Sequence, residues 1–270
     1  MLEGKIAIIT GAGRGIGAAT ARLFAAHGAT VIVGDIDRAP LDETVTAITA
    51  AGGQAVAVLG DATDPAYPAQ LVAAALAHGG LDILVANAGY TWDAMAHKLE
   101  DEQWQAMLDI HLTAPFRLVR AAAPFIRDTA KREIAEHGQA QARKLIFISS
   151  TSGTRGNLGQ ANYAAGKAGI TGVAKTMAKE WGAFNVQSNA VAFGLIETRL
   201  TAAKEQGEST ERAGQQVALG VPTQLRELSK LLIPLGRPGT VDEAAGPILF
   251  LASPLSNYVS GQVLEVTGGM

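Results

Sequence analysis

The chain contains no cysteine, so it can form neither disulfide bonds nor a zinc site built from thiolates. Its 22 basic and 25 acidic side chains nearly cancel, and a net charge of −3 provides no electrostatic surface for nucleic acid. No run of about 18 or more uncharged apolar residues occurs, so no membrane-spanning helix is expected. The N-terminus lacks the apolar core and cleavage site of a signal peptide. These absences predict a soluble, cytoplasmic protein with no nucleic-acid or membrane partner.

Apolar residues and glycine are abundant instead, since 48% of the chain is hydrophobic and 31 residues are glycine. With 270 residues, such a chain can bury the core of one large α/β domain. Short apolar runs alternate with longer helical patterns through most of the sequence. This alternation predicts parallel strands joined by right-handed crossovers, with ligands bound at the carboxyl ends of the strands.

A glycine-rich loop follows the first predicted strand, Lys5 to Thr10, and opens a helix from Ile16 to Ala26. Its glycines at 11, 13, 15 and 17 let the backbone approach a ligand closely, and the helix N-terminus offers N–H groups to a pyrophosphate. The second strand ends at Asp35, twenty residues beyond Gly15, near the spacing at which a carboxylate meets the adenosine ribose. A carboxylate there repels a 2′-phosphate, so NAD is favoured over NADP.

Two more polar residues follow predicted strands further along the chain. Asp61 comes after the strand Ala55 to Leu59, and Asn87 comes after the strand Leu81 to Ala86. Each has a local explanation, because Asp61 could cap the next helix and Asn87 could stabilise a turn. Since both fall at the ligand-binding edge of the sheet, we expect them to contact the cofactor.

The segment from Ser150 to Lys167 carries the pattern that points to chemistry. Ser150 ends an apolar strand, and Tyr163 and Lys167 are four residues apart on the following helix, so both project from one face. A phenol has a pKa of about 10 in water, and an ammonium one turn away lowers it toward the range of a general acid or base. The Ser150 hydroxyl could hold a substrate carbonyl beside that phenol. Tyrosine and lysine at this spacing are also common by chance, and a serine can simply end a strand.

Taken together, Thr10-Gly-x-x-x-Gly-x-Gly17, Asn87-Ala-Gly89, Ser150 and Tyr163-x-x-x-Lys167 resemble the short-chain dehydrogenases/reductases. The similarity covers nearly the whole chain and is strongest to the 3-oxoacyl-carrier-protein reductases and related carbonyl reductases. It implies one Rossmann-type domain over residues 1–270, a doubly wound parallel sheet of seven strands with helices on both faces, and a homotetramer. It also implies that Tyr163 is the acid/base, that Ser150 holds the carbonyl, and that Lys167 binds the nicotinamide ribose and lowers the pKa of Tyr163.

The expected cofactor contacts combine the glycine loop, the strand ends and the catalytic pair. They are Gly11, Arg14, Gly15, Ile16, Gly17, Asp35, Asp61, Ala62, Asn87, Ala88, Gly89, Tyr163, Lys167, Ile196 and Thr198. The last two match family positions that meet the nicotinamide carboxamide. The four histidines at 27, 78, 97 and 137 are isolated and have no metal-ligand spacing, so no metal site is predicted.

The chain departs from the family pattern on the helix predicted from Glu102 to Arg127, where Pro115 and Pro124 suggest a kink and a fresh start. His111 stands where an asparagine usually completes a proton relay. Imidazole can donate and accept, so we expect His111 either to serve the relay, titrating near pH 6–7, or to be a satisfied core residue. The polar stretch 128–144 is longer than the family usually has and is interpreted as a solvated helix extension and loop.

Two departures follow the catalytic segment. Phe193 replaces the proline that usually precedes Gly194, which puts the turn geometry in question and places an aromatic ring near the nicotinamide. Residues 199–235 are amphipathic and contain Gly207, Gly214, Gly220 and Pro222, so we expect a mobile lid over the substrate.

The sequence therefore predicts an NAD(H)-dependent oxidoreductase that transfers a hydride between nicotinamide and a small-molecule ketone or secondary alcohol. A 3-oxoacyl thioester is the favoured substrate. A polyol, a steroid or another secondary alcohol would suit the same catalytic residues. An alternative of another class is a non-catalytic dinucleotide sensor that kept the fold and lost the chemistry.

Overall fold

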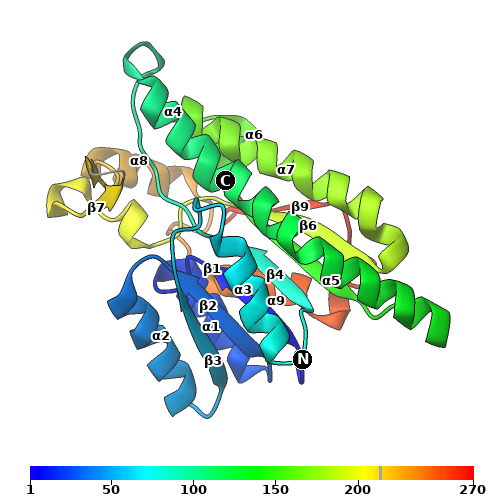
Figure 1. Cartoon of the computed structure of the whole chain (residues 1–270). Helices are drawn as coiled ribbons and strands as arrows, with labels where there is room; N and C mark the ends of the chain where they lie inside the picture. The colour runs from blue at the N-terminus through cyan, green and yellow to red at the C-terminus, as the bar shows by residue number, and fades with distance from the viewer. Residues whose placement is uncertain (213–214) are drawn as a thin grey trace.

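The strands of the central sheet are short apolar runs because helices bury both of its faces. The computed structural model describes residues 1–212 and 215–270. The sheet strands are β1 (Ile6–Thr10), β2 (Thr30–Asp35), β3 (Gln54–Leu59), β4 (Ile83–Ala86), β5 (Arg143–Ser150), β6 (Val186–Phe193) and β9 (Val263–Val266). They run parallel in the order β3-β2-β1-β4-β5-β6-β9 (Figure 1). The order reverses between β1 and β4, which opens a crevice at their carboxyl ends. The predicted seven-stranded Rossmann-type sheet is confirmed.

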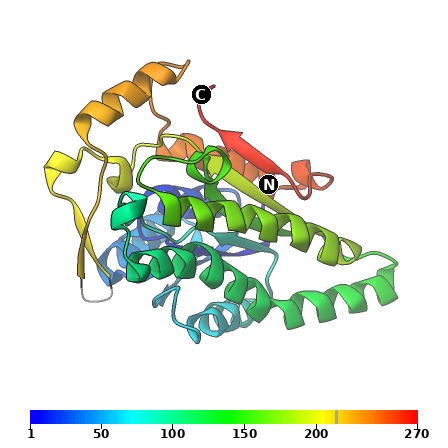
Figure 2. The same ribbon diagram turned by 90° about the horizontal axis from the view of Figure 1, so that it is seen from above.

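Two hydrophobic cores lie between the sheet and its helices (Figures 1 and 2). On one face, α1 (Gly15–Ala26), α2 (Arg38–Ala50) and α9 (Val241–Ala252) bury Phe24, Ile48 and Ile248. On the other face, the helices are α3 (Tyr67–Ala77), α5 (Ala114–His137) and α7 (Ala161–Trp181). Helix α7, which carries Tyr163 and Lys167, is held against β5 and β6 by this second core. No helix among the described residues is both long enough and apolar enough to cross a membrane.

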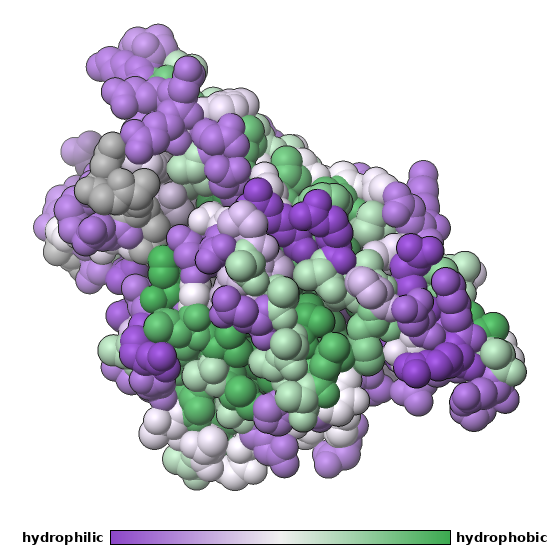
Figure 3. All heavy atoms as spheres, in the orientation of Figure 1, coloured by the Kyte–Doolittle hydropathy of each residue, from purple (hydrophilic) through white to green (hydrophobic). Residues whose placement is uncertain are grey.

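The helix predicted from Glu102 to Arg127 is three elements, namely α4 (Asp101–Leu108), the π-helical turn η2 (Asp109–Thr113) and α5. The kink comes from this π-turn, which carries His111 and is a common device at functional sites. Pro124 does not begin a new helix, because α5 continues through it to His137. The extension is solvated as predicted, and hydrophilic residues cover the outer end of α5 (Figure 3). Arg143 and Lys144 are buried instead because they begin strand β5, and Arg143 is paired with Glu133 at 2.7 Å.

The segment 199–235 leaves the central sheet and forms several short elements near the carboxyl ends of its strands (Figures 1 and 2). It contains the 3-10 turns η4 (Arg199–Thr201) and η5 (Lys204–Gln206), an antiparallel hairpin of β7 (Ser209–Arg212) and β8 (Gln215–Ala218), and α8 (Thr223–Leu232). Residues 213–214, and with them Gly214, lie outside the described residues. The sequence does not predict the hairpin, because its strands are short and mostly polar and lack a clear alternation.

Candidate active site

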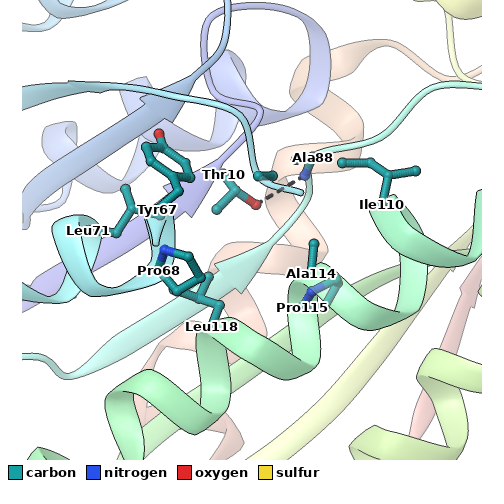
Figure 4. A pocket seen from close by; sticks show the side chains of 10 residues that line it. Thr10, Tyr67, Pro68, Leu71, Ala88, Ile110, Ala114, Pro115 and Leu118 are labelled. Atoms are coloured by element: carbon teal, nitrogen blue, oxygen red, sulfur yellow. Dashed lines mark hydrogen bonds between the residues drawn. The ribbon is translucent and has the colours of Figure 1, made fainter. Parts of the chain in front are cut away.

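One large cleft of about 830 Å³ runs along the carboxyl ends of the central strands. Its lining joins the glycine loop on one side to Ser150, Tyr163 and Lys167 on the other, and it includes every predicted site residue except Gly17. A second cavity, beside Thr10 and Ala88, measures only about 10 Å³ and is surrounded by apolar side chains (Figure 4). That volume holds at most about one water molecule, so the large cleft is the candidate site.

The glycine loop is shaped for close approach of a ligand. Gly11 has φ +63°, and a Cβ on it would lie 2.6 Å from the Cα of Ala88. Helix α1 begins after Arg14 without a side-chain cap, so its first N–H groups remain available beside the cleft-lining Gly15 and Ile16. A Cβ on Gly17 would collide with the carbonyl oxygen of Gly11. Gly17 therefore allows close packing of α1 on the loop, and unlike the other predicted contacts it does not line the cleft. The loop fits a dinucleotide pyrophosphate.

Asp35 lies at the end of β2, on the rim of the cleft. Its carboxylate accepts hydrogen bonds from the backbone N–H of Gly13 at 2.8 Å and of Asp37 at 3.0 Å. These two bonds fix the carboxylate next to the glycine loop, at the position where an adenosine ribose meets a Rossmann-type sheet.

Asp61 and Asn87 both line the cleft, but Asp61 does not cap the next helix, because α3 begins after Ala66 without a side-chain cap. Asp61 accepts hydrogen bonds at 2.8 Å from both the N–H and the hydroxyl of Thr63. Asn87 donates to the carbonyl oxygens of Thr10 at 2.9 Å and Gly11 at 3.0 Å. Both N–H donors of the Asn87 amide are thus used to tie β4 to the glycine loop.

The end of β6 forms the wall opposite the glycine loop. Strand β6 continues regularly through Phe193, which pairs with Ser150, so the missing proline leaves the strand intact. The Phe193 ring is buried in the core under α9, with part of it reaching the cleft. Ile196 and Thr198 follow, and the hydroxyl of Thr201 donates to the Ile196 carbonyl and holds this turn.

Ser150, Tyr163 and Lys167 converge as the sequence predicts. Ser150 caps the short helix α6 (Thr151–Arg155), accepting the N–H of Ser152 at 3.1 Å, and it shares a hydrogen bond with the Tyr163 phenol. Lys167 is 4% exposed, and its Nζ donates to the carbonyl oxygen of Ile148 at 2.7 Å. The same Nζ lies 5.6 Å from the centre of the Tyr163 ring.

Burial dominates the protonation of this pair. It raises the pKa of Tyr163 to about 12, and the hydrogen bond from Ser150 only partly opposes it. Burial also lowers the pKa of Lys167 to about 7. The prediction that Lys167 lowers the pKa of the phenol is therefore wrong for the protein's own groups. Burial disfavours the charged form of each group, which raises the pKa of the phenol and lowers that of the ammonium.

His111 lies against the catalytic pair but does not titrate as expected. It is 2% exposed, its Nε2 donates to the carbonyl oxygen of Tyr90 at 2.7 Å, and its ring meets that of Tyr163 edge-to-face at 4.8 Å. Burial, reinforced by the charge of Lys167, holds the pKa of His111 well below 6.5, so a titration near pH 6–7 is wrong. Its Nδ1 is buried and has no hydrogen-bond partner among the described residues.

Sequence reasoning missed Asp93, which lines the cleft close to Tyr163. The available signal was its place in the loop after Asn87-Ala-Gly89, at the carboxyl end of β4. Its carboxylate accepts a hydrogen bond at 2.9 Å from Gln160, which precedes α7 and also lines the cleft. Among the described residues, no group of three or more His, Asp or Glu could hold a metal ion.

Comparison with known proteins agrees with this geometry. A family model described as short chain dehydrogenase matches residues 5–209. The chain is 38% identical over 270 residues to the 3-oxoacyl-[acyl-carrier-protein] reductase FabG of Thermotoga maritima, covering 100% of this chain and 98% of that protein. It is 39% identical over 272 residues to the hydroxyacyl-CoA dehydrogenase ChsB1 of Mycobacterium tuberculosis, covering 99% of this chain and 78% of that protein.

A solved structure of a putative 2-deoxy-d-gluconate 3-dehydrogenase from Agrobacterium tumefaciens, described with bound NADP, superposes with a TM-score of 0.82 at 33% identity. That superposition covers 99% of this chain and 96% of the other. The residues that line the cleft therefore fit an NAD(P) cofactor, and a solved structure of the same fold is described with bound NADP. The chain belongs to the short-chain dehydrogenase/reductase family and is an oxidoreductase that interconverts a ketone and a secondary alcohol.

Proposed function

We propose that the enzyme interconverts 3-oxoacyl and 3-hydroxyacyl thioesters. The observation that carries the chemistry is the convergence of Ser150, Tyr163 and Lys167 in one cleft with the glycine loop. Two relatives, 38% and 39% identical, are named for acyl groups attached to a carrier protein or to coenzyme A. Acyl groups on both carriers are thioesters, which supports this substrate class.

In the proposed reaction, the glycine loop and Asp35 would hold the dinucleotide, whose nicotinamide would supply or accept the hydride exchanged with the carbonyl carbon. The Ser150 hydroxyl donates a hydrogen bond to the carbonyl oxygen and holds it beside the Tyr163 phenol. Tyr163 gives its proton to that oxygen during reduction and takes it back during oxidation. Lys167, with its pKa of about 7, can release and recover a proton near neutrality. The unpartnered Nδ1 of His111 offers an acceptor for a relay behind this pair.

Apolar side chains form part of the substrate half of the cleft, and they favour an acyl chain over a polyol. Tyr90, Met107, Ile110 and Val217 form a buried cluster that Tyr163 packs against. Leu232 of α8, which is 67% exposed, also lines the cleft. An acyl tail would bury the exposed Leu232 side chain, whereas polyol hydroxyls beside it would lose hydrogen bonds to water.

We assign the role of a substrate lid to residues 199–235. Val217 of the hairpin is 2% exposed, because it packs in the cluster beside the catalytic tyrosine. Backbone hydrogen bonds between Lys204 and Val221 and between Val221 and Ala202 anchor the hairpin to the chain that follows β6. The lid thus covers the substrate half and leaves the cofactor half to the glycine loop.

We propose that NAD(H) is preferred over NADP(H). The support is local, since the carboxylates of Asp35 and Asp37 both line the ribose end of the cleft and would repel a 2′-phosphate. The solved structure described with bound NADP shows that the fold accommodates NADP, so it does not support a preference for NAD.

A substrate panel tests the function directly. Acetoacetyl-CoA, a keto-gluconate and a ketosteroid are each offered with NADH and with NADPH, and absorbance at the nicotinamide band is followed. We expect kcat/KM for acetoacetyl-CoA to exceed the others at least tenfold. Faster turnover of the keto-gluconate would replace the thioester by a polyol-type substrate. Cofactor binding without turnover of any ketone would favour the sensor.

We also propose that the chain acts as a homotetramer in the cytoplasm, as its resemblance to the family implies. Light scattering on the purified chain after size exclusion measures the assembly. A mass near that of one 27.9 kDa chain would contradict it.

A further inference from the structure

A continuous run of hydrogen bonds leads from the cleft rim to the catalytic serine. The Gln160 amide nitrogen donates to Asp93 at 2.9 Å, and the Ser152 hydroxyl donates to the Gln160 amide oxygen at 2.8 Å. The backbone N–H of Ser152 then donates to the Ser150 hydroxyl at 3.1 Å, and Ser150 shares a hydrogen bond with Tyr163. The run joins the loop after β4 to the start of α7 and the end of β5.

The chemistry of each group gives this run a fixed polarity. A carboxylate only accepts hydrogen bonds, so Asp93 holds the NH₂ side of the Gln160 amide toward itself. The amide oxygen must then face Ser152, where it also accepts the Asn157 amide at 3.0 Å. Ser152 is 8% exposed. Its hydroxyl is held by the Gln160 amide oxygen, and its backbone N–H is directed at Ser150. One lone pair of the Ser150 oxygen is occupied, which limits the directions in which its hydroxyl can point.

We propose that Gln160 and Asp93 are positioning residues that orient the Ser150 hydroxyl for the substrate carbonyl. This inference rests on the function proposed above for Ser150 and Tyr163. It extends that function because neither Gln160 nor Asp93 is needed to touch the reacting atoms.

Asp93 has a second effect, which is electrostatic. More than a third of its surface is exposed, yet its negative charge acts on Tyr163 and raises the pKa of the phenol. The other groups facing Tyr163 are Ser150, Lys167 and the neutral His111. Burial raises the pKa of Asp93, and the hydrogen bond from Gln160 and the charge of Lys204 only partly oppose this rise. Removing the charge of Asp93 should therefore make Tyr163 more acidic.

The positioning role is tested with Gln160→Met, which keeps the shape of the side chain and removes its amide. We expect kcat to fall about tenfold, in line with the loss of one orienting hydrogen bond, while cofactor affinity stays unchanged. Gln105→Ala is the matched control, since Gln105 donates to Asp109 at 2.9 Å on the exposed surface. A kcat for Gln160→Met within twofold of the control overturns the proposal.

Combining Gln160→Met with Ser150→Ala shows whether Gln160 acts through Ser150 or independently of it. If Gln160 acts through Ser150, Gln160→Met should have no further effect on kcat in the Ser150→Ala background, measured in single turnovers. A persisting tenfold loss in that background overturns the inference. Full activity of Ser150→Ala itself would instead defeat the proposed function, so the two failures are distinguishable.

Asp93→Asn tests the electrostatic effect. The alkaline limb of ketone reduction, where Tyr163 loses its proton, should move to lower pH, and alcohol oxidation should gain activity at lower pH. Thermal unfolding shows whether the fold is kept. An unshifted pH profile in a folded variant contradicts the effect of Asp93 on Tyr163.

Discussion

The two halves of the cleft are built on different principles. In the cofactor half, the glycine loop supplies backbone N–H donors and Asp35 a carboxylate, and both come from one continuous segment from β1 to the end of β2. In the catalytic half, Ser150, Tyr163, Lys167 and His111 come from three separate elements, and three of them are buried groups with shifted pKa values. Local chain geometry determines the properties of the cofactor half, and burial of the side chains determines those of the catalytic half.

This contrast explains where sequence motifs are sufficient. A glycine loop works wherever a strand precedes it and a helix follows, because its φ angles and N–H groups are local properties. The acidity of Tyr163 depends on every group packed around it, including Asp93 from a distant loop. Substitutions in the two halves should therefore fail in different ways.

The largest expected effect is that of Tyr163→Phe in the catalytic half. Removing the phenol hydroxyl removes the proton donor, and kcat should fall by about a thousandfold, within the range of general acid–base catalysis. NADH affinity, followed by fluorescence titration, should remain within threefold of the wild type. Turnover at the wild-type rate would refute the mechanism.

Lys167→Met tests the role of burial in the catalytic half by its effect on thermal stability. Because burial depresses the pKa of Lys167 to about 7, the unfolded chain binds more protons than the folded one between that value and about 10.4. Burial of Lys167 therefore destabilises the folded wild type most below pH 7, and this destabilisation decreases as the pH rises. The Tm advantage of Lys167→Met over the wild type should be greatest near pH 6 and shrink toward pH 10. A constant difference would show that Lys167 is not buried as a neutral amine.

Asp35→Ser addresses the cofactor half. It removes the carboxylate that faces the ribose, so the ratio of kcat/KM for NADPH to that for NADH should rise about tenfold, a transition-state change of about 1.4 kcal/mol. The maximal rate with saturating cofactor should change little, because the catalytic half is untouched. An unmoved ratio would show that Asp35 does not set the choice.

His111→Asn should have the smallest effect. The imidazole is neutral over the working range, so the pH profile should stay the same between about pH 6 and 8, with kcat within roughly threefold. Steady-state rates at closely spaced pH values measure this. A limb that disappears in the variant would mean that His111 titrates after all, and near-complete inactivation would give the imidazole a specific role.

The sequence alone determined the parts that depend on local pattern. Apolar runs alternating with helical patterns gave the sheet, and the spacing from Gly15 to Asp35 placed the carboxylate at the cleft. The four-residue spacing of Tyr163 and Lys167 put both on one face of α7, beside Ser150. These features rest on the periods of strands and helices, which the order of residues fixes.

Only the tertiary structure decided the protonation of the catalytic groups and the neighbours that hold them. The π-turn that turns His111 inward, the hairpin that places Val217 beside Tyr163, and the run from Asp93 to Ser150 all join segments far apart in the chain. Burial sums over the whole packed surroundings, and no spacing in the sequence records it. For that reason the sequence located Lys167 correctly and misjudged its effect on Tyr163.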